Sequence, residues 1–208
     1  KNLVVQPTHL MHGAEYDEMC EAIEQYKDKF ESVSIAEPLL GEVGSDATVI
    51  NADKEAVAKA ITAAAVADSG FESLDAAKDA GTAFVFMGHG TAHVAKVTYS
   101  QMQTQMQNLG YENVFIGTVE GEPEETACES VIEKVRAAGY TTVILRPLMV
   151  VAGDHANNDM AGDEDGSWKT EFEKAGFEVT TVVEGLGGLT DIQNLFVAHA
   201  QAAVDSLK

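Results

Sequence analysis

Four side chains that could bind a metal or exchange protons each follow a short apolar segment. They are His9, His89, Glu120 and His155. Imidazole and carboxylate groups together suit a borderline divalent metal such as cobalt, nickel, iron or zinc. Imidazole also changes charge near neutral pH and can act as a base. One such histidine alone would carry little weight. Two histidines next to glycines, together with a glutamate, favour a shared site with room for a large ligand.

The segments that must position these side chains alternate between strand-like and helix-like patterns. Strand signals lie at residues 3–6, 32–36, 83–87, 114–119, 142–145 and 178–183. Helical spacing marks residues 14–30, 53–68 (with Asp53 as its cap), 98–109, 124–138, 167–175 and 190–207. Strands that alternate with helices predict an α/β fold with parallel strands covered on both faces. Ligands of such folds bind at the carboxyl ends of the strands, so we expect the four side chains to share one rim.

The charge of the chain excludes several classes of function. There are 34 acidic and 13 basic residues, which gives a net charge of −21. Two arginines and eleven lysines can neutralise few phosphates, which disfavours nucleic acids and anionic membrane surfaces as partners. Metal cations remain candidate partners, because an acidic chain attracts them. No apolar run approaches the roughly 20 residues of a membrane helix.

Other motifs are weaker or absent. Cys20 and Cys128 form no CxxC pair, so we expect two buried small residues rather than a zinc or dithiol site. The Gly88-His89-Gly90 loop is similar to an oxyanion-hole loop, but the chain has no G-x-S-x-G nucleophile motif. It also has neither a P-loop nor a G-x-G-x-x-G motif after the first strand. The glycines at residues 185–188 fit a plain turn better than a phosphate site.

Two further features have ordinary structural interpretations. An acidic cluster precedes Ser167, and its spacing does not fit a calcium loop; its members are Asp159, Asp163, Glu164 and Asp165. We expect a solvated loop that leads into a helix capped by Ser167. His199 falls on the apolar face of the last helical segment, where we expect a core histidine.

Taken together, these motifs resemble the anaerobic cobalt chelatases of the CbiK type, which insert cobalt into sirohydrochlorin during corrin synthesis. The resemblance covers essentially the whole chain. It rests on residues 9–16, FMGHGTAH at 86–93, IGTVEG at 116–121, PLMVVAGDHANNDMAGDEDGSWK at 147–169, and GLGG at 185–188 with Ile192, Phe196 and His199 downstream.

The resemblance implies a class II chelatase fold, in which two similar α/β lobes, each a parallel sheet flanked by helices, enclose a tetrapyrrole cleft. Residues 1–80 would form the first lobe and residues 81–208 the second, with the last helix packing back on the first lobe. Relative to the family, the first lobe would lack its N-terminal segment.

The resemblance also implies roles for individual residues. The catalytic groups would be His89, His155 and Glu15, and the metal ligands would be His89, Glu120 and His155. The tetrapyrrole would contact His9, Leu10, Met11, Met87, Gly90, His93, Met149 and Gly153. Because sirohydrochlorin carries many carboxylates, we expect the pocket to be neutral or basic through Arg146, Lys96 or helix N-termini.

The partners implied are sirohydrochlorin and Co²⁺, with Fe²⁺ or Ni²⁺ as alternative metals and no further cofactor. The family also implies a homo-oligomer in the cytoplasm, or in the periplasm if a signal peptide has been removed. A non-catalytic protein that binds or carries a metal or a heme-like tetrapyrrole on the same fold is the alternative function.

Overall fold

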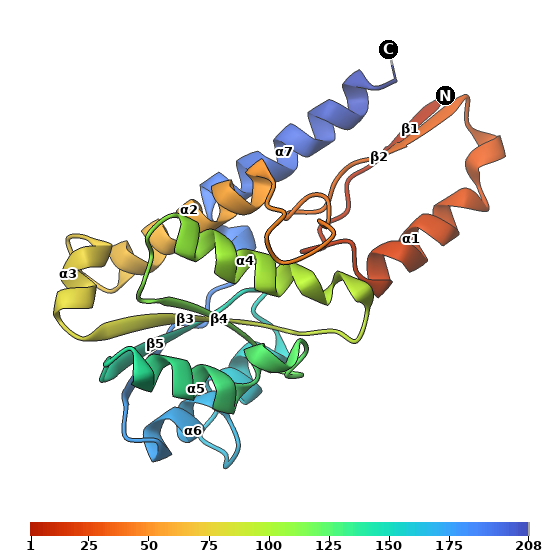
Figure 1. The fold of residues 1–208 in the computed structure, drawn as a ribbon. Coiled ribbons are helices and arrows are strands. Elements are labelled where there is room, and N and C mark those ends of the chain that lie inside the picture. Colours follow the sequence, from red (N-terminus) through yellow and green to blue (C-terminus); the bar gives the residue numbers. More distant parts are fainter. Residues whose placement is uncertain (208) are drawn as a thin grey trace.

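The computed structural model describes residues 1–207, which form two separate parallel sheets with helices around them (Figure 1). The strands are β1 (Asn2–Val5), β2 (Ser32–Ile35), β3 (Thr82–Gly88), β4 (Val114–Thr118), β5 (Thr142–Pro147) and β6 (Glu178–Thr181). The helices are α1 (Ala14–Glu24), α2 (Ala52–Asp68), α3 (Leu74–Asp79), α4 (Val97–Asn108), α5 (Cys128–Ala137), α6 (Trp168–Lys174) and α7 (Thr190–Asp205). None of the helices in residues 1–207 is long and apolar enough to span a bilayer.

The larger sheet has four parallel strands in the order β4-β3-β5-β6. β3 is central, and all seven of its residues are buried. A strand covered on both faces is expected to be apolar throughout rather than alternating, which explains its TAFVFMG sequence. Parallel neighbours require crossover connections, and here α4, α5 and α6 supply them.

Alternate residues of each strand point into two different cores. Phe84, Phe86 and Ile144 pack beneath α2, α4 and α7, whereas Val85 and Leu145 pack against α5 and α6. Figure 1 shows these two helical layers above and below the sheet. The separation follows from the two-residue period of a β-strand.

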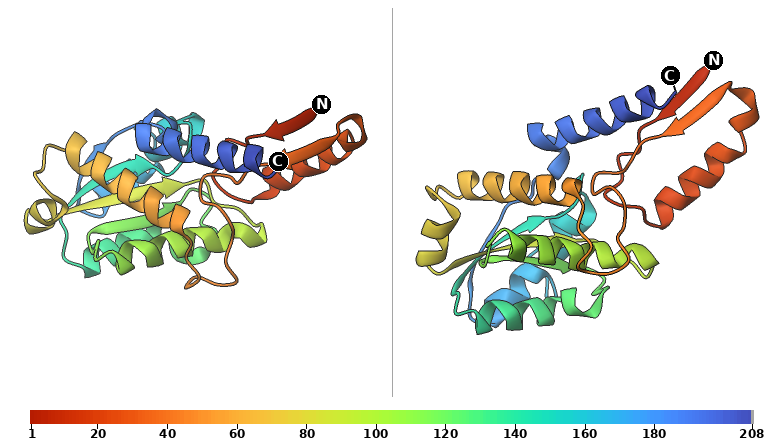
Figure 2. Two further views of the ribbon diagram at one scale, coloured as in Figure 1. Left: turned by 90° about the horizontal axis from the view of Figure 1, so that it is seen from above. Right: turned by 45° about the horizontal axis from the view of Figure 1, so that its top comes forward.

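The smaller sheet consists of β1 and β2, paired in parallel from Asn2↔Ser32 to Val5↔Ile35. Together with α1 it extends away from the larger sheet, and α7 runs along it (Figure 2). None of the residues of α1 is fully buried, in contrast to six in α2. The expected α/β class with helix-flanked parallel sheets is confirmed, but the two sheets are unequal, with two strands and four.

Several element boundaries differ from the sequence prediction for local reasons. The helix predicted for residues 14–30 ends at Glu24 and is followed by a 3₁₀ turn, Lys27–Lys29. The cap of α2 is Asn51, whose side chain accepts from Lys54 N, rather than Asp53. The cap at Ser167 is confirmed, because its side chain accepts from Thr170 N.

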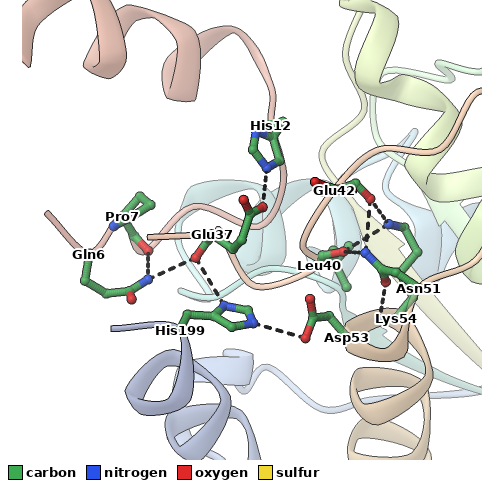
Figure 3. Close-up of polar contacts among 10 residues, drawn as sticks. All are labelled: Gln6, Pro7, His12, Glu37, Leu40, Glu42, Asn51, Asp53, Lys54 and His199. Atoms are coloured by element: carbon green, nitrogen blue, oxygen red, sulfur yellow. Dashed lines mark hydrogen bonds and ion pairs between the residues drawn. The ribbon is translucent and has the colours of Figure 1, made fainter. Parts of the chain in front are cut away.

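A polar network joins α7 to α2 and to the segment after β2 (Figure 3). His199 on α7 contacts the Glu37 carbonyl through Nδ1 at 3.1 Å and Asp53 Oδ1 through Nε2 at 3.0 Å. Its side chain is 11 % exposed, so it is largely buried, but it lies in a polar network rather than in the apolar core, with a partner for each ring nitrogen.

Lys54 supports the same segment from below (Figure 3). Its ammonium is fully buried and donates to the carbonyls of Leu40 at 2.9 Å and Glu42 at 2.7 Å. Leu40 N in turn donates to the Leu10 carbonyl at 2.9 Å. The network therefore fixes the segment that follows β1, which lines the cavity described next.

Candidate functional site

A cavity of about 520 Å³ lies where the carboxyl ends of β1, β3, β4 and β5 come together. This volume is within the usual range for a ligand pocket. The position is the one that parallel sheets favour for ligands. Its wall consists of Thr8, His9, Leu10, Met11, Gly13, Glu15, His89, Gly90, Thr91, Ala92, Tyr99, Glu120, Glu122, Leu148, Met149, Val150 and Val151.

His89 is positioned by the turn after β3. Its Nδ1 lies 2.8 Å from the Gly90 carbonyl, and a carbonyl only accepts hydrogen bonds. The ring proton is therefore assigned to Nδ1, which leaves a lone pair on Nε2 in the neutral ring. Gly90 N donates to the Tyr99 hydroxyl at 3.1 Å, which ties this turn to α4.

His155 brings a second imidazole to the same point from the π-helical turn η4 (His155–Met160) after β5. Its Nε2 lies 3.1 Å from His89 Nε2, and the two rings meet at 79°. Two nitrogens at this separation can both lie ~2.1 Å from one metal ion, with an angle of about 95° between them. That angle is close to the 90° between neighbouring ligands of an octahedral ion.

Glu120 follows β4 and lines the cavity beside this pair. Its backbone N–H donates to the His89 carbonyl at 2.9 Å, which keeps the two residues on adjacent turns. Within residues 1–207, however, no three His, Cys, Asp or Glu side chains converge closely enough to hold a metal. The assignment of Glu120 as the third ligand therefore stays a prediction.

The remaining predicted site residues divide into two groups. Those in the cavity wall are Glu15, from the first turn of α1, and His9, Leu10, Met11, Gly90 and Met149. Those outside the cavity wall are Met87, Gly153 and His93. Met87 is buried against the α5–α6 layer, and Gly153 is exposed in the turn before His155. His93 lines a neighbouring hollow with His12, and its Nε2 lies 3.2 Å from Asp17 Oδ2.

The charge of the cavity differs from the sequence prediction. Three carboxylates line it, from Glu15, Glu120 and Glu122, and Lys96 is bound to Glu122 at 2.6 Å. The expectation that Arg146 makes the pocket basic is wrong. Its side chain is 5 % exposed, is absent from the wall, and pairs with Asp68 at 2.6 Å and with Glu184.

Several contributors to the site were not predicted from the sequence. Tyr99 and Glu122 line the cavity because α4 and the turn after β4 pack there, and no local pattern marks them. The sequence predicts that Asp159 lies in a solvated acidic loop, but its Oδ2 lies 2.6 Å from His155 Nδ1. The four-residue spacing between Asp159 and His155 was the available signal, since residues four apart on a helix are neighbours.

Comparisons with known proteins agree with this geometry. A family model described as Cobalt chelatase (CbiK) matches residues 1–205. A sirohydrochlorin cobaltochelatase of Salmonella typhimurium is 30 % identical over 205 residues, which cover 99 % of this chain and 69 % of that protein. The sirohydrochlorin cobaltochelatase CbiKC of Nitratidesulfovibrio vulgaris is 30 % identical over 208 residues, which cover 99 % of this chain and 66 % of that protein.

The fold is also shared with a solved structure. The sirohydrochlorin chelatase SirB of Bacillus subtilis subspecies spizizenii, in complex with cobalt, aligns with a TM-score of 0.56. The alignment covers 98 % of this chain and 70 % of the other at 14 % identity, so it supports the chelatase-like fold alone. From the family match and the two relatives, this chain belongs to the cobalt chelatase (CbiK) family.

Proposed function

We propose that this protein is a sirohydrochlorin cobaltochelatase, which inserts Co²⁺ into the tetrapyrrole. The observation that carries the proposal is the His89–His155 pair, whose Nε2 atoms lie 3.1 Å apart beside a cavity lined by carboxylates. Neutral imidazole is a suitable ligand for Co²⁺, and two such ligands leave several coordination positions free for transfer of the ion. The relatives in the same family carry this activity in their names.

The reaction replaces two pyrrole protons of the ring by one divalent ion. In the proposed mechanism, His89 and His155 hold Co²⁺ with Glu120 and release it to the ring nitrogens. Glu15, which lines the cavity from the first turn of α1, or one of the histidines accepts the protons. No step requires an electron donor, because the metal keeps its oxidation state.

The tetrapyrrole is proposed to lie between two lobes, one around each sheet, with the division near residue 80. The cavity supports this proposal, because its wall combines residues after β1 of the small sheet with residues after β3, β4 and β5 of the large one. α7 contacts β1 and β2, as a last helix packed back on the first lobe would. α2 and α3 precede the proposed division but contact α4 and β3, so they pack on the larger sheet rather than around the smaller one.

The experiment that tests the function mixes the protein with sirohydrochlorin and Co²⁺ and follows the absorption spectrum of the ring. We expect multiple turnovers in the wild type and a loss of at least 100-fold in His155→Ala, because one imidazole ligand is missing. His12→Ala is the matched control, since His12 lies outside the cavity wall and pairs with Glu37. Full activity of His155→Ala with an intact fold would contradict the assignment.

The same assay separates an enzyme from a carrier. A spectral change that stops at one equivalent of protein would indicate a protein that binds the metal or the tetrapyrrole without releasing product. Parallel reactions with Fe²⁺ and Ni²⁺ test metal choice, which two imidazoles do not determine by themselves.

We also propose that the protein is a homo-oligomer that works in the cytoplasm, with the periplasm as the alternative. Both statements rest on the family. Analytical ultracentrifugation tests the first statement and cell fractionation the second.

A further inference from the structure

We propose that Asp159 is a positioning residue for metal binding, which holds His155 with its Nε2 lone pair facing His89. The inference rests on the proposed function, in which His155 binds Co²⁺. It adds a residue that would not touch the metal or the tetrapyrrole but would decide how a ligand is presented to them.

The contact between the two side chains carries the argument. Asp159 Oδ2 lies 2.6 Å from His155 Nδ1, which is short for an N–H···O hydrogen bond and typical of one to a charged acceptor. A carboxylate accepts, so the ring proton is assigned to Nδ1. The lone pair is then left on Nε2, the atom that lies 3.1 Å from His89 Nε2.

Both histidines therefore have the same arrangement of ring nitrogens. In His89 the acceptor of Nδ1 is the Gly90 carbonyl, and in His155 it is the Asp159 carboxylate. Histidines that bind metals commonly donate their second ring N–H to a carbonyl or a carboxylate, which fixes the tautomer and the ring orientation. The backbone supplies that acceptor for His89, whereas for His155 a side chain must supply it.

The π-helical turn holds Asp159 in place. Asn157 Nδ2 donates to the Gly153 carbonyl at 2.7 Å, and Asn158 Nδ2 donates to Asp154 Oδ1 at 2.6 Å. Three consecutive side chains, from residues 157 to 159, thus each reach back four residues. Ala156 and Met160 are fully buried and anchor the turn in the protein. π-helical turns of this kind occur frequently at functional sites.

His155 needs such an anchor because it is poorly enclosed. Its side chain is 41 % exposed, and among residues 1–207 its ring nitrogens contact Asp159, through a hydrogen bond, and His89, through facing Nε2 lone pairs. Removal of the carboxylate would free the ring to rotate and to move its proton to Nε2, which would block the metal-facing lone pair. A merely stabilising ion pair on the surface would instead leave metal binding unchanged.

The test compares Asp159→Ala and Asp159→Asn with the matched control Asp163→Asn in the complete chain. Asp163 lies in the same acidic cluster but pairs with Lys169 at 2.5 Å. The dissociation constant of Co²⁺ alone is measured by calorimetry, and the tautomer of His155 is measured by long-range ¹H–¹⁵N NMR without metal. We expect Asp159→Ala to weaken Co²⁺ binding by roughly 10–100-fold and to shift the proton from Nδ1 towards Nε2.

Asp159→Asn preserves the shape of the side chain and decides the question if the alanine variant does not fold. We expect it to weaken Co²⁺ binding less than Asp159→Ala does, because the Asn amide oxygen can still accept from Nδ1 but carries no charge, whereas Asp163→Asn should bind as the wild type does. Wild-type affinity and an unchanged tautomer in the folded Asp159 variants would overturn the inference. If His155→Ala also binds and inserts Co²⁺ normally, both the proposed function and the role of Asp159 are contradicted. If His155→Ala fails to bind Co²⁺, only the role of Asp159 is contradicted.

Discussion

Gly90 determines where His89 points, because its conformation and its surroundings both exclude a side chain. Its φ is +91°, in the left-handed region that favours glycine. A Cβ at this position would also lie 2.9 Å from Glu120 Cβ, which is too close for two carbon atoms. Any larger residue must therefore move the turn of His89 or that of Glu120.

We predict that Gly90→Ala lowers both stability and Co²⁺ binding. The strained φ alone costs about 1–2 kcal/mol, and the collision with Glu120 adds to it. Gly70→Ala is the control, because Gly70 has a φ of +77° but no atom within 4 Å of its Cβ position. Urea unfolding and Co²⁺ titration measure the two effects. Equal losses of stability in the two variants, with normal Co²⁺ binding, would show that the collision is relieved elsewhere.

At the scale of elements, the first turn of α2 contains a buried lysine, Lys54, whereas lysines are usually exposed to solvent. Lys54 is fully buried, and this burial lowers the pKa of its ammonium from the ordinary 10.5 to about 8. The nearby carboxylates of Asp53, Glu37 and Glu42 oppose the effect without reversing it. The helix thus accepts a desolvated cation in order to hold the carbonyls of Leu40 and Glu42.

We predict that Lys54 makes the protein more stable as the pH rises from about 8 to about 10.5. In this window the unfolded chain keeps the Lys54 proton while the folded chain loses it, so the free energy of unfolding increases with pH. The increase is at most about 3.4 kcal/mol, since the pKa falls by about 2.5 units and one unit equals about 1.36 kcal/mol. Urea unfolding at several pH values measures it as the difference between the wild type and Lys54→Met.

The control for this prediction is Lys59→Met on the same helix. Lys59 is exposed and pairs with Glu55 at 2.5 Å, which raises its pKa above the ordinary value. Its substitution should leave the pH dependence below 10 unchanged. If the difference between the wild type and Lys54→Met does not vary with pH, Lys54 keeps an ordinary pKa despite its burial.

At the scale of the whole molecule, the net charge of −21 includes three carboxylates that line the cavity. Glu15, Glu120 and Glu122 line it, and Lys96 is the neighbouring cation, held by Glu122. Such a field attracts a divalent cation and repels a substrate that carries many carboxylates. The two substrates of the proposed reaction should therefore respond to salt in opposite directions.

We predict that kcat/KM for Co²⁺ falls as ionic strength rises from 0.01 to 0.5 M, because the Debye length shrinks from about 30 Å to a few ångströms. For sirohydrochlorin the same quantity should rise, since the repulsion is screened. Initial rates in sodium perchlorate, which coordinates metals weakly, measure both. Rates that do not depend on salt would mean that the charge serves solubility rather than capture of the metal.

The class of the fold and the strand ends that carry the candidate site residues follow from local patterns in the sequence. The β3 segment, AFVFM with GHG after it, predicts a buried strand that delivers His89 to the carboxyl edge, and β3 ends at Gly88, directly before His89. The cap at Ser167 is equally local and was equally predictable. Family motifs then identified His89 and His155 as a pair although 66 residues separate them.

The residues that surround this pair of histidines depend on how distant segments pack together. The contact of Tyr99 with Gly90 depends on how α4 packs. Arg146 lies outside the cavity wall because it pairs with Asp68 and Glu184, and Asp68 is distant in the sequence. The hydrogen bond between Asp159 and His155 depends on the π-helical turn. Composition alone predicts a solvated acidic loop for this segment. The neighbours of each charged side chain are set by contacts between segments that are far apart in the sequence. Local sequence patterns do not specify these contacts, because they form only when the sheets and helices pack together.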